Sequence, residues 1–227
     1  MLNPSIRQRT SLHTLVLVIL TALACSGVLL QLWLSLNLAL ANGKSIGRGF
    51  IVYIGFFTVL TNIFVALILT FQLALTFKLT TKELSISRFF THPQTMACAA
   101  TSIVLVGLGY HFLLRNIWNP QGLQWHVDLQ LHYVMPILFC LYWLFALPKS
   151  VLGWWSPLVA CIYPVGYFAY ILIRGSILGA YPYPFIDVTT IGYSLAFRNA
   201  FGLLIVFILV GFVLLALGKA NSHFKVR

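Results

Sequence analysis

Long apolar runs separated by short polar segments dominate the chain and predict membrane-spanning helices. A helix needs about 20 mainly apolar residues to cross the hydrocarbon core of a bilayer. Six runs meet this requirement, at residues 14–36, 50–77, 95–114, 129–147, 154–173 and 199–218. The pattern therefore predicts an all-α fold. We expect a single domain over residues 1–227, a bundle of six transmembrane helices with short basic tails at 1–13 and 219–227.

The composition agrees with a membrane protein. Hydrophobic residues make up 60% of the chain and charged residues 7%, which excludes a soluble domain. The formal net charge of +11 would suggest nucleic-acid binding in a soluble protein. Here the 14 Lys and Arg residues fall almost wholly between the apolar runs. Such charges are typical of topology signals and headgroup contacts, so we expect membrane lipids and not nucleic acid as partners.

The positive charges also predict an orientation. An even number of spans leaves both termini on one side of the membrane. The residues on that side are Arg7, Arg9, Lys78, Lys82, Arg88, Lys149, Lys219, Lys225 and Arg227. Those on the other side are Lys44, Arg48, Arg115, Arg174 and Arg198. By the positive-inside rule both termini are cytoplasmic, and segments 37–49, 115–128 and 174–198 face out.

The fourth run carries the histidine that hydrophobicity places inside a span. An ionisable side chain in lipid faces the protein interior or a wet cavity, so His132 marks a candidate site. Asp128 lies one helical turn before it and is expected to orient the imidazole. Pro136 lies one turn after it and has no N–H for the carbonyl of His132, so a bend is expected there. Packing between helices is the alternative role for this histidine.

Small polar residues form a stripe on the second run. In GFFTVLTNIF, spacings of three and four residues put Gly55, Thr58, Thr61 and Asn62 on one helical face, which is expected to look inward. Packing of helices through small and hydroxyl residues would produce the same stripe. Under the predicted topology, Thr58 and His132 lie in the same leaflet.

The segment YPYPFID, after the fifth run, lies on the same side of the membrane. Its two prolines among aromatic residues predict a compact turn that caps a cavity, with Tyr183 and Asp187 near the site. A hydroxyl becomes a nucleophile when a base such as histidine is within reach and a third group orients that base. Asp128 and Asp187 are the two candidates for the third group. A metal or haem held by His111 and His132 lacks further ligands, so we expect no metal and no cofactor.

These features resemble the androgen-induced protein family of six-span membrane proteins, particularly its bacterial relatives. The resemblance rests on FFTVLTN in the second span, LHYVMP opening the fourth and YPYPFID after the fifth, and it extends over most of the spans. Animal members of that family are intramembrane threonine hydrolases that cleave fatty-acid esters of hydroxy fatty acids. The resemblance implies Thr58 as nucleophile, with Thr61 second, and His132 as the histidine. It also implies a bacterial plasma membrane.

Two hypotheses follow from the sequence. The first is an intramembrane lipid-ester hydrolase in which a fatty-acyl ester enters sideways between helices and meets Thr58 and His132, with Asn62 and Tyr183 among the lining residues. The second is a non-enzymatic six-span protein that binds or transports a small lipophilic ligand through the same polar groups. Covalent labelling by a fluorophosphonate distinguishes the two hypotheses.

Overall fold

A computed structural model of the protein describes residues 4–146 and 151–224. It confirms an all-α fold with six helical segments long and apolar enough to cross a membrane, as expected of an integral membrane protein. These segments are Ser11–Ala41, Phe57–Thr76, Pro93–Leu114, Leu123–Ala146, Ser156–Leu178 and Val188–Asn221. Lys149, Lys225 and Arg227, which were counted for the orientation, lie outside the described residues.

The helices are α1 (Pro4–Ala41), α2 (Ile46–Tyr53), α3 (Phe57–Thr76), α4 (Ser85–Thr91), α5 (Pro93–Gly109), α6 (Leu123–Leu129), α7 (Met135–Ala146), α8 (Ser156–Ala160), α9 (Ile162–Leu178) and α10 (Val188–Phe224). Three shorter elements are the π-helical turns η1 (Tyr110–Leu114) and η2 (Gln130–Val134) and the 3-10 turn η3 (Pro184–Ile186). The third span is α5 with η1, and the fourth is α6, η2 and α7 in succession.

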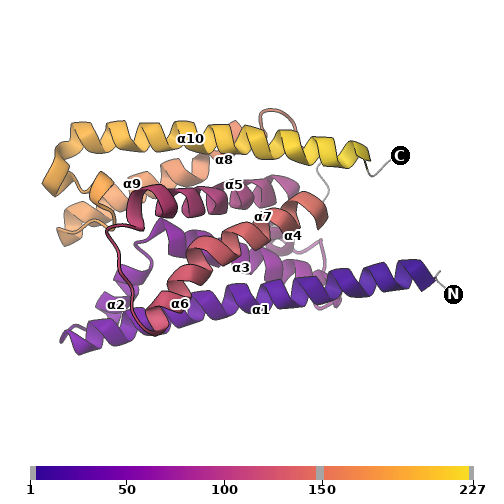
Figure 1. Ribbon diagram of the computed structural model, residues 1–227, viewed down its shortest axis with the longest axis horizontal. Helices are drawn as coiled ribbons and strands as arrows, with labels where there is room; N and C mark the ends of the chain where they lie inside the picture. The colour runs from indigo at the N-terminus through magenta and orange to yellow at the C-terminus, as the bar shows by residue number, and fades with distance from the viewer. Residues whose placement is uncertain (1–3, 147–150, 225–227) are drawn as a thin grey trace.

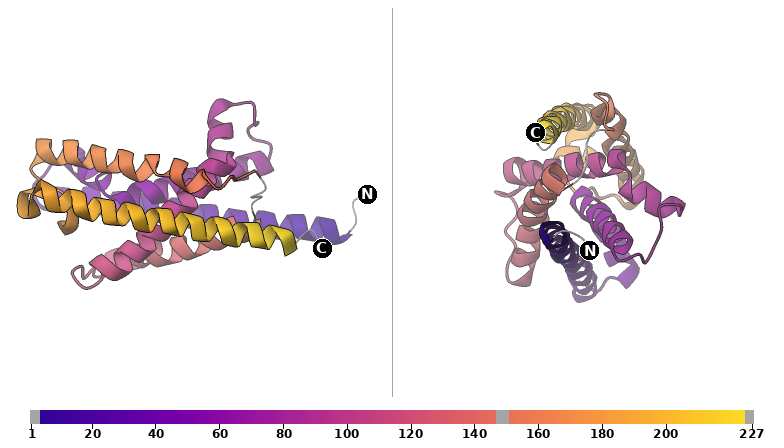
Figure 2. Two further views of the ribbon diagram at one scale, coloured as in Figure 1. Left: turned by 90° about the horizontal axis from the view of Figure 1, so that it is seen from above. Right: turned by 90° about the vertical axis from the view of Figure 1, so that its right-hand side faces the viewer.

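The long first and last helices lie on opposite sides of the bundle, as the end-on view in Figure 2 shows. The start of α1 and the end of α10 lie at the same end, as six spans require (Figure 1). We call the other end, which carries α2, α6 and the start of α10, the distal end (Figure 1). Helix α5 packs against α3, α7, α8 and α10, and fully buried Val65, Ile103 and Phe139 belong to the core around it.

Several helix ends differ from the predicted boundaries. Both tails are partly helical, because α1 already begins at Pro4 and α10 continues to Phe224. The segment 174–198 is not one loop: α9 ends at Leu178 with left-handed Gly179 behind it, and α10 begins at Val188. Gly179 has φ +64°, a conformation that suits glycine at a helix C-terminus. A second positive φ, +74° at Gly192, kinks α10 near its start.

The second span is broken before Thr58, which the sequence pattern did not predict. Three carbonyl groups near the break accept hydrogen bonds from α9: Ile51 from Arg174, Ile54 from the Tyr170 hydroxyl and Gly55 from the Tyr167 hydroxyl. A Cβ at Gly55 would lie 2.8 Å from the Arg174 guanidinium carbon, so this close approach needs glycine. The polar side chains of α9 thus replace the helical hydrogen bonds that α2 and α3 lack. Gly55 therefore lies in the break and not on the stripe.

Prolines interrupt the fourth and fifth spans as well. Pro164 has no N–H for the carbonyl of Ala160, and that carbonyl accepts a hydrogen bond from the Cys98 thiol instead. Pro136 likewise leaves the carbonyl of His132 without its helical donor. The π turn η2 comes directly before, and the N–H of Met135 bonds to Gln130, five residues back. Single π turns of this kind are common at functional sites.

Candidate functional site

His132 and Asp128 form a close pair at the distal end of the fourth span. Nδ1 of His132 lies 3.2 Å from Oδ1 of Asp128 and 2.9 Å from its backbone carbonyl oxygen. Both oxygens are acceptors, so Nδ1 carries a proton and Nε2 of the neutral ring has the free lone pair. Asp128 is 5% exposed. The predicted turn spacing of the two residues is therefore an actual contact, and Asp128 fixes the tautomer of the imidazole.

Two aromatic residues from the end of the third span complete the surroundings of this pair. The Tyr110 ring stacks on the His132 imidazole with centroids 4.0 Å apart and planes inclined by 20°. The Trp118 indole N–H donates a 3.1 Å hydrogen bond to Oδ1 of Asp128. Tyr110 begins the π turn η1 and His132 lies in the π turn η2, so the two irregular turns meet at the imidazole. The ring is held on one face by stacking and at Nδ1 by hydrogen bonds.

Thr58 lies in the first turn of α3, directly after the break. The N-cap residue, Phe56, supplies no side-chain hydrogen bond to this helix start. Instead the Thr58 N–H donates to the hydroxyl of Tyr183 at 3.3 Å. Tyr183 is 8% exposed and its ring packs edge-on against Phe56. The turn YPYPFID thus inserts a tyrosine against the start of α3, where free N–H groups create a positive end.

Asn62 lies one turn further along α3 and bridges two spans. Its Nδ2 donates to the carbonyl of Thr58 at 2.8 Å and to that of Leu131 at 3.2 Å, and the side chain is 1% exposed. The Leu131 carbonyl would bond to the N–H of Met135 in a regular helix, but that N–H is turned to Gln130. Asn62 therefore supplies the donor that the π turn removes, and it ties the backbone of Thr58 to the residue before His132.

Thr61 and Asp187 lie elsewhere. The Thr61 hydroxyl is fully buried and lies 3.2 Å from the Tyr163 hydroxyl of α9. Asp187 precedes α10 and accepts hydrogen bonds from the backbone N–H and hydroxyl of Thr189, as a helix-capping residue does. The hydrogen bond from the Thr189 hydroxyl lowers the pKa of the Asp187 carboxyl. Asp128, and not Asp187, is the carboxylate in contact with the imidazole.

Two cavities share Thr58 in their lining. The polar cavity, of about 300 Å³, is lined by Thr58, Asp128, His132 and Tyr183 together with Gln31 and Gln124, among others. The apolar cavity, of about 270 Å³, lies between the distal half of α5 with η1, α9 and α10. Thr58, Tyr110 and Tyr183 line both cavities. The expected convergence of a hydroxyl, an imidazole and the capping turn is therefore present, whereas Thr61 and Asn62 lie behind the polar cavity's wall.

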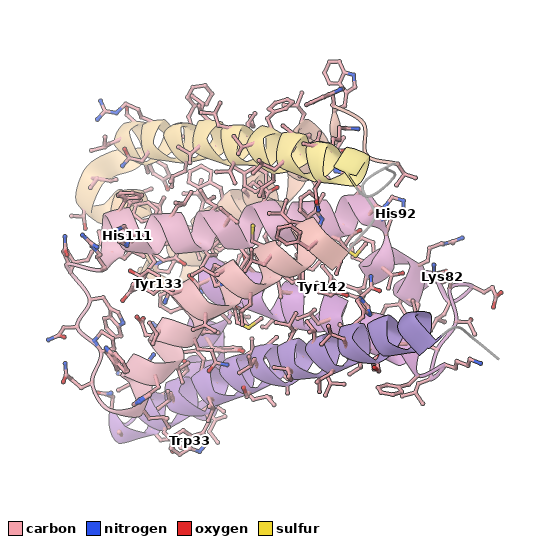
Figure 3. The ribbon with its side chains drawn as sticks, turned by 45° about the vertical axis from the view of Figure 1, so that its right-hand side comes forward. Trp33, Lys82, His92, His111, Tyr133 and Tyr142 are labelled. Carbon is pink, nitrogen blue, oxygen red and sulfur yellow. The ribbon has the colours of Figure 1, made fainter. Side chains whose placement is uncertain are left out.

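His111 is not part of this arrangement. Its Nδ1 lies 3.2 Å from the Tyr133 hydroxyl, and its Nε2 lies 3.0 Å from the Arg115 guanidinium. Figure 3 shows His111 and Tyr133 at the distal end, away from Lys82 and His92 at the end that carries the termini. Within the described residues, no group of three or more His, Cys, Asp and Glu side chains is placed to hold a metal ion.

The sequence pattern missed four residues with polar groups that line the polar cavity: Gln31, Tyr110, Trp118 and Gln124. No feature of the sequence separates Tyr110 and Trp118 from aromatic residues of the membrane interface, or Gln31 from a residue that packs helices. Gln124 was not considered, yet its amide donates a 2.9 Å hydrogen bond to the Gln31 side-chain oxygen. Their roles depend on contacts between the first, third and fourth spans, for which the sequence carries no local signal.

Comparison of the chain with protein-family models, with curated proteins and with solved structures found no match. The resemblance to the androgen-induced protein family therefore stays a prediction that rests on the motifs of the chain itself.

Proposed function

We propose that the protein is an intramembrane lipid-ester hydrolase, with Thr58 as nucleophile and His132 as general base. The observation that carries the proposal is the His132–Asp128 pair in one cavity with Thr58. A base that a carboxylate orients activates a weak nucleophile when the hydroxyl comes within its reach, and the lining of one cavity by both Thr58 and His132 supports that approach. The proposal includes the implied bacterial plasma membrane as location and membrane lipids as the source of the fatty-acyl ester.

In this reaction the Thr58 hydroxyl oxygen bonds to the ester carbonyl carbon while its proton passes to Nε2 of His132. The alcohol then leaves with that proton as the C–O bond breaks. Water, deprotonated by the same nitrogen, cleaves the resulting acyl-threonine and releases the fatty acid. Nδ1 keeps its proton throughout, because the Asp128 carboxylate accepts a hydrogen bond from the Nδ1–H group. General base catalysis of this kind contributes about 10²–10⁴-fold to a rate, and the positive end of α3 favours the developing oxyanion.

A non-enzymatic role in binding or transporting a lipophilic ligand is the second candidate function, and the apolar cavity beside Thr58 favours it. A ligand of this kind needs apolar walls and a few polar groups that fix its orientation. It does not need a base with a free lone pair beside a hydroxyl. Covalent capture at Thr58 therefore separates the two functions.

The test is labelling of the purified, reconstituted protein with a fluorophosphonate, followed by identification of the modified residue. Thr58→Ala and His132→Ala should each abolish labelling and ester hydrolysis, and the double variant should be scarcely worse, because members of a catalytic pair fail together. Thr61→Val is the matched control, since it removes a neighbouring hydroxyl outside the cavity. Absence of labelling and of hydrolysis in folded wild-type protein would reject the hydrolase and favour ligand binding.

A further inference from the structure

The two cavities give any molecule bound at Thr58 two different environments. Thr58, Tyr110, Leu114 and Tyr183 form their shared wall. An ester that reaches both cavities with its carbonyl carbon at Thr58 passes between these shared side chains, and its two substituents then extend in two directions. The chemistry of each cavity indicates which substituent it accepts.

The apolar cavity suits an unbranched acyl chain. Apart from Thr58 and tyrosine rings, its walls are aliphatic and phenylalanine side chains. A water molecule occupies about 30 Å³, and a methylene group is of similar size, so 270 Å³ corresponds to about nine methylene groups; because the cavity opens to the outside of the bundle, a longer chain can extend beyond it. Val165 of α9 and Phe201 of α10 line it and are 51% and 65% exposed on the outside of the bundle. In a membrane that surface faces lipid, which gives the chain access from the bilayer.

The polar cavity, which is lined mainly by apolar side chains but has more polar groups than the apolar cavity, suits a small uncharged alcohol. The paired amides of Gln31 and Gln124 supply donors and acceptors without charge. Asp128 is the acidic residue in its wall, and among the described residues no lysine or arginine lines either cavity. A carboxylate or phosphate in this space would face the buried Asp128 carboxylate with no counter-ion, which is unfavourable in a medium of low dielectric constant.

We propose that the substrates are neutral single-chain esters, with the acyl chain in the apolar cavity and an uncharged polar alcohol in the polar cavity. This inference rests on the proposed hydrolase function. It assigns the two ends of the substrate to opposite sides of Thr58. It excludes esters whose alcohol part carries a negative charge, and it therefore departs from the hydroxy-fatty-acid esters cleaved by the animal proteins that the chain resembles, whose alcohol part carries a carboxylate.

Two glycines provide a matched test of the acyl site. Gly109 lines the apolar cavity, and Gly166 lines a third cavity, between α3, the start of α5 and α9, that does not include Thr58. An added Cβ meets no atom within 4 Å at either position. A leucine at Gly109 would fill the volume of about four of the nine methylene groups and prevent their burial.

The experiment compares hydrolysis of decanoyl and acetyl esters of ethylene glycol. Gly109→Leu should lower the decanoyl-to-acetyl rate ratio at least tenfold, and Ala200→Leu, on the opposite wall, should lower it as well. Gly166→Leu should leave the ratio unchanged. A ratio that Gly109→Leu and Ala200→Leu do not alter, in protein that still hydrolyses esters, would overturn the acyl assignment while the hydrolase function stands.

The alcohol site is tested with decanoyl esters of ethylene glycol and of glycolate, which differ mainly in one carboxylate. After correction for their rates of alkaline hydrolysis, the ethylene glycol ester should react at least tenfold faster. Equal or faster hydrolysis of the glycolate ester would overturn the exclusion of anionic alcohols.

If wild-type protein hydrolyses none of these esters, the proposed function fails. Binding of the ether 2-decyloxyethanol, which cannot be hydrolysed, then tests the two binding cavities alone. Weaker binding to Gly109→Leu than to Gly166→Leu supports the assignment of the cavities, and equal binding to the two variants rejects it.

Discussion

Asn62 is expected to hold the candidate site together, and its replacement by leucine tests the structure most directly. The Asn62 amide joins the carbonyl of Thr58 on α3 to that of Leu131 in the π turn η2. Leucine has a similar size and no donor. Asn62→Leu therefore removes both hydrogen bonds with little change in packing.

The cost in stability follows from what happens to Leu131. Hydrogen bonds between membrane helices contribute about 0.6 kcal/mol on average and at most about 1.7 kcal/mol. The Leu131 carbonyl has in addition lost its helical donor, since the N–H of Met135 bonds to Gln130. A buried acceptor left unpaired costs about 1–3 kcal/mol. We expect Asn62→Leu to lower the free energy of unfolding by about 2 kcal/mol, which is about 30-fold in the equilibrium constant.

The variant can avoid this cost only by changing the helix. If the N–H of Met135 turns from Gln130 to Leu131, the π turn becomes a regular turn and the Leu131 carbonyl is again paired, although the carbonyl of His132 still faces Pro136, which has no N–H. The hydrogen-bonded turn then spans four residues where it spanned five. The change rotates the preceding segment, which contains Asp128 and His132, by about 100° relative to α7. That rotation takes the imidazole away from Thr58. We therefore expect the rate of fluorophosphonate labelling to fall at least tenfold.

The assay combines reversible unfolding in mixed micelles with labelling kinetics of the same samples. Thr61→Val is the control, because Thr61 is equally buried and its hydroxyl faces Tyr163 without supporting a backbone carbonyl. It should cost about 0.6 kcal/mol, the average for such a bond, and label normally. If Asn62→Leu matches wild-type protein in both measurements, the bridging role of Asn62 is refuted.

Three further predictions concern packing, electrostatics and orientation. Gly107→Ala should destabilise the protein by about 1–3 kcal/mol, because the added Cβ would lie 3.2 Å from the carbonyl oxygen of His132 and 3.3 Å from the ring of Pro136. Gly109→Ala, whose Cβ meets no atom within 4 Å, should not destabilise the protein in the same unfolding assay. Asp128→Asn should slow fluorophosphonate labelling by roughly 10²–10⁴-fold, because the carboxylate that stabilises the imidazolium is lost although the backbone carbonyl of residue 128 still accepts from Nδ1. Asp187→Asn should not slow labelling; equal effects would contradict the assignment of the orienting carboxylate. A cysteine at Lys82 should react with an impermeant thiol reagent only after cells are opened, and reaction on intact cells would reverse the predicted orientation.

The sequence by itself determined the number of spans and the end of the bundle where the polar residues of the candidate site lie. Runs of about 20 apolar residues must be helical in lipid, because each backbone group then finds its partner within the segment. An even count of spans brings the starts of the second and fourth spans to the side that carries YPYPFID. The four-residue spacing of Asp128 and His132 was enough to predict their contact, since such residues are neighbours on any helix.

Only the tertiary structure decided where the helices break and which polar groups face the cavity. The break before Thr58 depends on hydrogen bonds from Tyr167, Tyr170 and Arg174, more than a hundred residues away in sequence. The π turn depends in the same way on Asn62 of another span. Local patterns encode helices because their hydrogen bonds are local. Where a helix is broken, its unpaired carbonyl groups accept hydrogen bonds from donors on other spans, and only tertiary packing brings those donors within reach.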